Sequence, residues 1–166
     1  MKKLYLVRHA KSSWAQTELP DVDRPLNERG YGDAHLVSKT LLHHMQAPDL
    51  LISSSAVRAM TTALIFARNF GYPAEKLQIE SQLYETSVQD YLEVLSRVTD
   101  QIESVMVFAH NFTISELVPY FLGATFEEMS TCSVLGINLD IEHWQDIRNA
   151  KGNRALYLFP KMLKEA

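Results

Sequence analysis

Short apolar runs alternate along this chain with segments whose apolar residues recur at helical spacing. Four apolar runs predict buried strands, at residues 4–7, 50–52, 77–79 and 105–109. Between them, the helical spacing predicts helices that carry Ala34 to Met45, Val57 to Phe70, Tyr91 to Val98 and Ile114 to Leu122. The expected stops are Ala47-Pro48, Gly71 and Gly123. Strands that alternate with helices indicate an α/β fold with a mainly parallel sheet.

The end of the chain has a different pattern. Residues 134–139 and 154–159 are extended, and a polar segment with Asn149, Gly152 and Asn153 separates them. This pattern predicts an antiparallel pair at one edge of the sheet. The sequence has no repeat, low-complexity tract or interdomain linker. We therefore expect one domain over residues 1–166, a three-layer α/β/α sandwich with a mainly parallel central sheet and an antiparallel edge.

Composition narrows the class of partner. The chain is 46 % apolar and 22 % charged, as globular proteins commonly are, with a net charge of −4 and a pI near 5.8. This balance argues against a nucleic-acid surface or a polybasic membrane anchor. No apolar stretch approaches the roughly 20 residues of a membrane span. The single cysteine, Cys132, excludes an intrachain disulfide and fits a reducing cytoplasm, where we expect the protein to reside. The oligomeric state is left open.

Polar residues that could carry chemistry follow the predicted strands. Arg8-His9 ends the first strand, a segment from Ser53 to Arg58 follows the second, Glu85 follows the third, and His110 follows the fourth. Parallel strands share one carboxyl edge, where open α/β sheets bind ligands. Two arginines and two histidines at that edge predict a pocket for a dianion, and helix starts after the second and fourth strands add backbone N–H groups.

The chemistry that suits these residues is phosphoryl transfer to a histidine. We expect Arg8 and Arg58 to lower the pKa of His9 and keep it neutral, as a nucleophile must be. The same cations neutralise charge on the transferring phosphoryl group, to which His110 would donate. Glu85 is the carboxylate at the strand ends placed to protonate a leaving group.

The residues that carry this chemistry occur in ordered motifs. They are Arg8-His9-Ala10-Lys11-Ser12-Ser13-Trp14, Arg24-Pro25-Leu26-Asn27-Glu28-Arg29-Gly30, Ser53 to Ala59, Thr62-Ala63, Leu83-Tyr84-Glu85 and Ala109-His110-Asn111. With these motifs the chain resembles the histidine phosphatase superfamily, which is phosphoglycerate mutase-like in fold, and most of all its SixA-type phosphohistidine phosphatase branch. The resemblance implies that His9 is the phosphorylated nucleophile and that Arg8, Arg58 and His110 complete the phosphate pocket. It places Glu85 at the position of the proton donor in many relatives.

Some positions depart from the superfamily pattern. Ala10 replaces the usual glycine, as in the SixA-type branch, and Ala15 stands where mutase-like relatives often have a phosphate-contacting asparagine. Phe112-Thr113 replaces a Pro-Gly-like turn, which alters the expected pocket wall. The chain also lacks the long insertions that cover the site in mutases. An open site suits a protein-borne phosphohistidine, or a range of small esters, better than an enclosed sugar phosphate.

Several residues near these motifs have two interpretations. Ser53 to Ser55 can cap a helix while supporting phosphate binding. Lys11 and Ser12 touch the substrate or face solvent, and Trp14 is a substrate-side wall or a loop anchor. Asn27 is expected to fix its loop. Glu85 could simply be a solvated carboxylate that opens a helix.

Other site types find little support in the sequence. His35, His43 and His44 lack the spacing of a metal site, so we expect no metal and no cofactor. Asp21-Val22-Asp23 has the spacing of an aspartyl-phosphate motif but follows no strand.

The sequence thus predicts a metal-independent phosphatase that acts on phosphohistidine in a partner protein through a covalent intermediate at His9. One alternative is a phosphatase of small phosphate monoesters. Another, of a different class, is an adaptor that binds phosphorylated partners without turnover.

Overall fold

Six strands form one mixed sheet in the computed structural model, which describes residues 1–126 and 128–165. The strands are β1 (Lys2–Arg8), β2 (Leu50–Ser53), β3 (Gln78–Ile79), β4 (Ser104–Ala109), β5 (Val134–Leu139) and β6 (Gly152–Leu158). Their order is β3-β2-β4-β1-β5-β6. The pairs among β3, β2, β4 and β1 are parallel, whereas β5 and β6 pair antiparallel, so the predicted antiparallel edge is confirmed.

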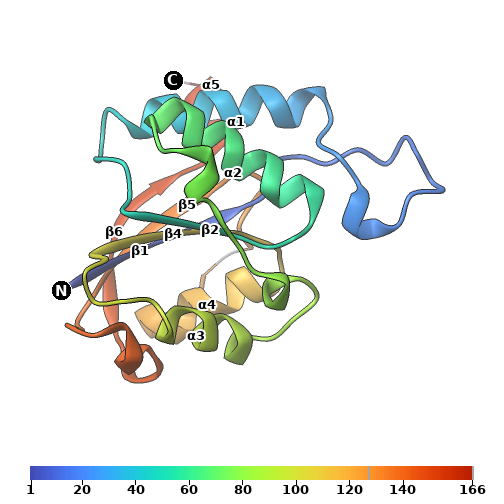
Figure 1. Ribbon diagram of the computed structural model, residues 1–166. Coiled ribbons are helices and arrows are strands. Elements are labelled where there is room, and N and C mark those ends of the chain that lie inside the picture. The colour runs from blue at the N-terminus through green and yellow to red at the C-terminus, as the bar shows by residue number, and fades with distance from the viewer. Residues whose placement is uncertain (127, 166) are drawn as a thin grey trace.

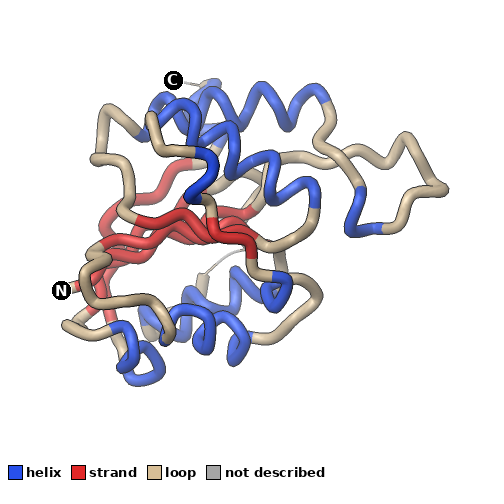
Figure 2. Tube along the Cα trace, viewed as in Figure 1, coloured by secondary structure: helices blue, strands red, loops and turns tan. Residues whose placement is uncertain are grey.

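Helices cover both faces of the sheet. They are α1 (Glu28–Leu41), α2 (Val57–Phe70), α3 (Val88–Ser96), α4 (Thr113–Leu122) and α5 (Pro160–Lys164). Figure 1 shows α1, α2 and α5 above the sheet and α3 and α4 below it, and Figure 2 shows the strands as the layer between them. The expected three-layer sandwich is therefore confirmed.

Burial on both faces explains why the strands read as continuous apolar runs. Along β1, Leu4 and Leu6 point into the core cluster on the α3 and α4 side. Tyr5 and Val7 point into the cluster beneath α1 and α2. Successive side chains of a strand alternate between faces, so a strand with helices on both faces is apolar throughout.

Two predicted boundaries were wrong. Helix α1 ends at Leu41, well before Pro48, because the next three side chains are exposed and give the helix no further apolar face. Met45 still packs on the core from a turn in which its N–H donates to Leu41 O at 2.9 Å. Gly152 and Asn153, expected in a polar connection, begin β6.

The connection itself contains a short 3-10 helix, Trp144–Asn149. Its Trp144 is fully buried, and the indole N–H donates to Ile102 O at 2.7 Å. This aromatic anchor explains why a segment that is polar in sequence is nevertheless ordered structure.

Residues 11–27, most of the segment between β1 and α1, project beyond the carboxyl end of the sheet (Figure 1). We call it the arm. Its two ends are held together by backbone bonds, from Ser13 N to Pro25 O at 2.8 Å and from Asn27 N to Lys11 O at 3.0 Å. Asn27 also caps α1, because its side chain accepts from Gly30 N at 2.8 Å. The expected loop-fixing role of Asn27 is confirmed.

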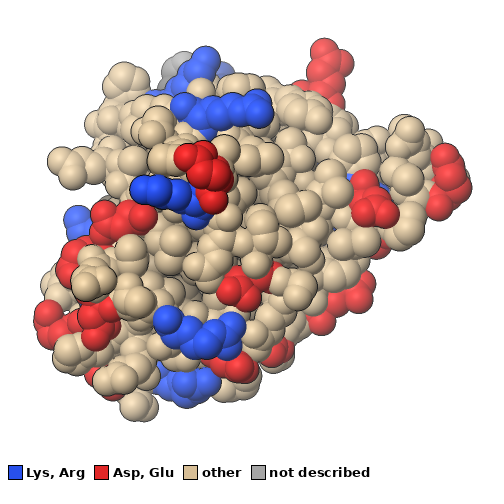
Figure 3. Space-filling model, in the orientation of Figure 1, with Lys and Arg blue, Asp and Glu red and all other residues tan. Residues whose placement is uncertain are grey.

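The surface carries charges of both signs. On the face in Figure 3, basic and acidic side chains are interspersed rather than gathered into one basic patch. Within residues 1–126 and 128–165, no helix is long and apolar enough to cross a bilayer.

Two glycines of α1 test how the base of the arm is held. A Cβ at Gly30 would lie 2.2 Å from Lys11 O, whereas a Cβ at Gly32 would meet nothing within 4 Å. We expect Gly30→Ala to lower the free energy of unfolding by about 1–3 kcal/mol, because a backbone oxygen must move. We expect Gly32→Ala to raise it by up to about 1 kcal/mol, because alanine favours the helix. Urea unfolding of both variants measures the difference, and equal shifts would contradict this explanation.

Candidate active site

His9 lies at the centre of the predicted site. It directly follows β1, its N–H donates to Ala109 O of β4 at 3.0 Å, and it is only 8 % exposed. The ring Nδ1 lies 2.7 Å from Ala10 O. A carbonyl oxygen only accepts hydrogen bonds, so Nδ1 carries the proton of the neutral ring. The lone pair of the ring is therefore on Nε2.

The environment keeps the His9 ring neutral. Burial is the main cause that lowers its pKa, to about 3, and the positive charges of Arg58 and Arg8 lower it further. The predicted direction is confirmed. Burial is the larger cause, because removing an imidazolium from water costs more than placing it near the two arginines.

His110 lies beside His9 at the end of β4. The two ring centroids are 5.2 Å apart. Ser54 Oγ lies 2.6 Å from His110 Nε2 and accepts from Ala56 N at 3.2 Å, so its own proton can be donated to the ring. Burial lowers the pKa of His110 to about 4. With Nε2 accepting from Ser54, His110 Nδ1 is a donor, and it is buried with no hydrogen-bond partner among the described residues.

Arg8 and Arg58 also place unpaired donors here. Arg8 donates through one terminal nitrogen to Met129 O at 2.7 Å and lies 3.7 Å from a Glu128 carboxylate oxygen. Arg58, on the first turn of α2, is 6 % exposed. The Nε atoms of both arginines are buried and have no hydrogen-bond partner in the part of the chain that the structure describes. Buried donors without acceptors are rare and indicate a place for an acceptor ligand.

Asp21 is a site residue that sequence reasoning missed. Its backbone oxygen accepts from Arg58 Nη1 at 2.7 Å and its carboxylate from Arg58 Nη2 at 3.0 Å. The carboxylate also accepts from Tyr84 Oη at 2.6 Å and from Arg24 Nε at 3.0 Å. The Tyr84 hydrogen bond and the two arginines hold the pKa of Asp21 well below its usual range. The Asp21-Val22-Asp23 spacing is that of an unrelated motif, so no sequence pattern identifies Asp21 as a site residue.

Tyr84 forms one side of the site. Its ring packs edge-on against His110, with centroids 5.6 Å apart. Burial, the hydrogen bond to Asp21 and the charge of Glu85 raise the pKa of Tyr84 to about 12. Glu85 itself is exposed and has a positive φ of 50°. The motif Leu83-Tyr84-Glu85 drew attention to this segment, but only to the carboxylate.

The predicted substrate-side residues differ in their surroundings. Ser12 is buried, and its hydroxyl accepts from Arg24 Nη1 at 2.8 Å. Trp14 is 69 % exposed, and the guanidinium of Arg24 lies 3.6 Å from its ring centroid. The Lys11 side chain is half-buried, and Phe112 beside His110 is 70 % exposed.

The helix after β2 was expected to be capped by Ser53 to Ser55, and the structure differs in part. Residue Ala56 is the N-cap of α2, which has no side-chain cap. The serine that matters here is Ser54, through its contact with His110.

Among the described residues, no group of three or more His, Cys, Asp or Glu side chains could hold a metal ion.

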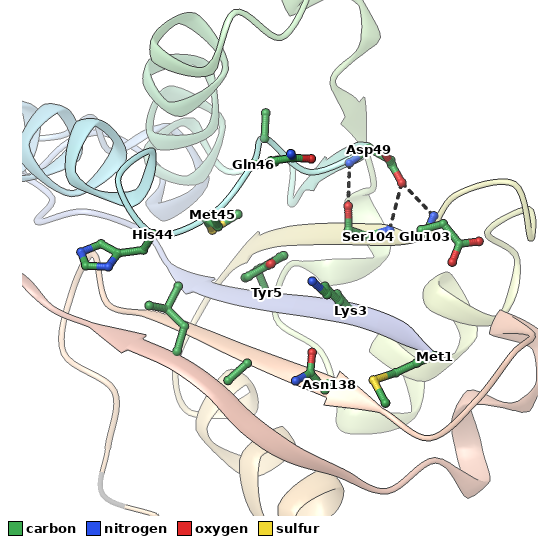
Figure 4. Close-up of a pocket in the computed structure, with 13 residues that line it drawn as sticks. Met1, Lys3, Tyr5, His44, Met45, Gln46, Asp49, Glu103, Ser104 and Asn138 are labelled. Carbon is green, nitrogen blue, oxygen red and sulfur yellow. Dashed lines mark hydrogen bonds between the residues drawn. The ribbon is translucent and has the colours of Figure 1, made fainter.

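A pocket of about 660 Å³ lies between the 44–49 segment and β1, β5 and β6 (Figure 4). Lys3, Tyr5 and Asn138 line it, and none of the predicted site residues does. It is therefore separate from the site at the carboxyl edge.

The family model described as histidine phosphatase superfamily (branch 1) matches residues 4–94. The chain belongs to the histidine phosphatase superfamily. The matched segment includes Arg8, His9, Arg58 and Glu85, whereas His110 lies beyond it.

Solved structures of histidine phosphatases extend the likeness to nearly the whole chain. The crystal structure of SixA from Agrobacterium tumefaciens covers 96 % of this chain and 98 % of its own, with a TM-score of 0.81 and 26 % identity. The structure of the protein histidine phosphatase SixA complexed with tungstate covers 97 % and 99 %, with a TM-score of 0.83 and 20 % identity. These matches confirm the phosphoglycerate mutase-like fold and the resemblance to the SixA-type branch, and the chain is a histidine-nucleophile phosphatase.

A sequence relative adds to this picture. An uncharacterized chloroplastic protein of Arabidopsis thaliana is 28 % identical over 153 residues, which are 87 % of this chain and 70 % of that protein. The sequence likeness to this relative therefore spans most of the chain.

We expect the free energy of unfolding of this histidine phosphatase to fall as the pH drops below about 6.5. Burial lowers the pKa of His9 to about 3 and of His110 to about 4 in the folded protein. Below about pH 6.5 the unfolded chain therefore binds more protons than the folded one. Each histidine lowers stability by about 1.4 kcal/mol per pH unit in this window. Urea unfolding from about pH 7.5 to about pH 5 measures the slope.

A variant of one buried histidine checks the source of the slope. His110→Asn removes one titrating group, so its slope should be about half that of the parent protein. His43→Asn changes an exposed histidine outside the site and is the matched control. Equal slopes for the two variants would contradict the assignment.

Proposed function

We propose that this protein hydrolyses phosphohistidine on a partner protein and that His9 carries the phosphoryl group as a covalent intermediate. The observation that supports the proposal most is the state of the His9 ring. Its Nδ1 is held by Ala10 O and burial keeps the ring neutral, so Nε2 has an available lone pair. Arg8, Arg58 and His110 each have a buried donor nitrogen with no hydrogen-bond partner among the described residues, which supports their proposed role as phosphate ligands.

In the first step, His9 Nε2 attacks the phosphorus of the substrate, and the bond from phosphorus to the substrate's ring nitrogen breaks. Arg8, Arg58 and His110 donate to the phosphoryl oxygens and stabilise their charge as the transfer proceeds. The departing nitrogen takes a proton from the carboxyl group of Glu85. The products are phosphohistidine at His9 and the unphosphorylated partner.

In the second step, water attacks the same phosphorus from the side that the substrate has left. The Glu85 carboxylate accepts a proton from this water as the new oxygen–phosphorus bond forms. The bond from phosphorus to His9 Nε2 breaks, and inorganic phosphate leaves. Both side chains return to their starting protonation states.

The surroundings of the site support a protein substrate. Trp14 on the arm and Phe112 beside His110 are large aromatic side chains with about two thirds of their surface exposed. Aromatic side chains are enriched in protein interfaces, because they bury large areas at little entropic cost. The related SixA with tungstate is described as a protein histidine phosphatase, and its fold is the same.

We expect wild-type protein incubated with a labelled phosphohistidine protein to retain an acid-labile label, and His9→Ala to retain none. Removing the nucleophile removes the covalent route, so hydrolysis should fall by about 1,000-fold or more. Activity should persist in EDTA. His43→Ala, an exposed histidine outside the site, is the matched control and should keep both label and activity.

A substrate panel decides between the candidate functions. The phosphohistidine protein should have a higher kcat/KM than aryl and alkyl phosphate monoesters. The reverse order would favour the small-ester phosphatase, and phosphate-dependent binding with no turnover would favour the adaptor. Either result would contradict the proposal.

The role of Glu85 predicts a dependence on the leaving group. Glu85→Gln should slow hydrolysis of an alkyl phosphate by about 100-fold or more, because its leaving oxygen needs a proton. An aryl phosphate with a good leaving group should be slowed far less. Glu75→Gln changes an exposed carboxylate elsewhere and is the control. Equal slowing of both esters would exclude Glu85 as the acid.

A further inference from the structure

Both terminal nitrogens of Arg58 are already bound within the protein. Nη1 donates to the backbone oxygen of Asp21 at 2.7 Å, and Nη2 donates to the Asp21 carboxylate at 3.0 Å. One residue of the arm therefore accepts from the two outer nitrogens of the guanidinium. The remaining nitrogen, Nε, is buried and has no hydrogen-bond partner among the described residues.

This arrangement determines which edge of Arg58 can meet a ligand. A guanidinium has five N–H groups in one plane and can pair two oxygens either through its end or through its Nε side. Asp21 takes the end. The side that includes Nε is left for an oxyanion, and rotation away from this orientation would break both bonds to Asp21.

Asp21 itself is held from two directions. Tyr84 Oη donates to its Oδ2 at 2.6 Å, and Arg24 Nε donates to its Oδ1 at 3.0 Å. Arg24 is 8 % exposed and also donates to Ser12 Oγ at 2.8 Å, so it fastens Asp21 to the base of the arm. A carboxylate with this many charge-assisted and hydroxyl donors is a fixed acceptor rather than a mobile one.

We propose that Asp21 is the positioning residue for Arg58: it holds the guanidinium so that the Nε edge faces the transferring phosphoryl group. The inference rests on the proposed role of Arg58 as a phosphate ligand. It gives the arm a function in catalysis, because the contact that orients the cation comes from the arm and not from the sheet. Asp21 does not touch the substrate in this assignment.

Asp21→Asn tests the proposal with little change of shape. The amide keeps one oxygen but replaces the other with a nitrogen donor, which would face donors of Arg58, Arg24 or Tyr84. We expect kcat/KM for an aryl phosphate to fall by about 100-fold, as is typical when a catalytic group is displaced by about 1 Å. Inhibition by inorganic phosphate should weaken as well.

Asp23→Asn is the matched control. Asp23 is exposed, lies two residues away in the same short 3-10 helix, Asp21–Asp23, and carries the same charge. It should retain wild-type kcat/KM. If both variants lose activity equally, activity depends on the overall charge or folding of the arm and not on the contact between Asp21 and Arg58, and the proposal is overturned. Faster turnover or tighter phosphate binding by Asp21→Asn would also overturn it, because Asp21 would then block Arg58 rather than orient it.

A double-mutant cycle separates positioning from a general structural role. In an Arg58→Ala background, Asp21→Asn should change kcat/KM by less than about 3-fold, since the group it orients is gone. A persistent 100-fold loss would mean that Asp21 acts elsewhere, which overturns the proposal. The dissociation constant of tungstate, measured on the same four proteins, should give the same pattern.

The cycle also keeps the two proposals apart. If Arg58→Ala alone leaves phosphate binding and turnover unchanged, the proposed role of Arg58 fails, and the inference on Asp21 fails with it. If Arg58→Ala is impaired but Asp21→Asn is not, only the inference on Asp21 fails. The aryl phosphate makes both results independent of the natural substrate.

Discussion

The parallel pairing of β1 with β4 is the constraint on which the site depends. In this register Arg8 lies opposite Ala109, and the residue that follows each strand is a histidine. His9 and His110 are thereby brought within 5.2 Å, although 100 residues separate them in the chain. A shift of one residue would turn every β1 side chain to the other face. The two core clusters that take Leu4 and Tyr5 on opposite faces therefore fix the register that brings the two histidines together.

Burial lowers the pKa of both histidine rings. Each histidine lies at the edge of a core that excludes water, and each loses the affinity for a proton that it would have in solvent. The backbone determines what the neutral rings can do. Ala10 O accepts a hydrogen bond from Nδ1–H of His9, while Ser54 contacts Nε2 of His110. Adjacent histidines therefore differ in which nitrogen is available, which suits one to attack and the other to donate.

The sequence was sufficient for the fold and for the residues at the strand ends. Continuous apolar runs predict strands that are buried on both faces, and helical spacing predicts the helices that cover them. Together these patterns predict the three layers. The boundary of α1 was misjudged, since Met45 keeps its place on the apolar face from a turn rather than a helix. Asp21 could not be found this way. It lies in the arm, where apolar residues follow no regular spacing. Its proposed role depends on contacts with Arg58 and Tyr84, which are 37 and 63 residues further along the chain.

The unpaired donors connect stability with function. A buried donor that lacks an acceptor costs about 1–3 kcal/mol, and the site holds such donors on Arg8, Arg58 and His110. The fold tolerates them because each side chain is fixed by other contacts: Arg8 by Met129 O, Arg58 by Asp21 and His110 by Ser54. In the proposed reaction, a phosphoryl group that accepts from all three donors would recover this free energy. Donors that are fixed in advance stabilise the charge of a transferring phosphoryl group without first having to reorient, as water molecules would.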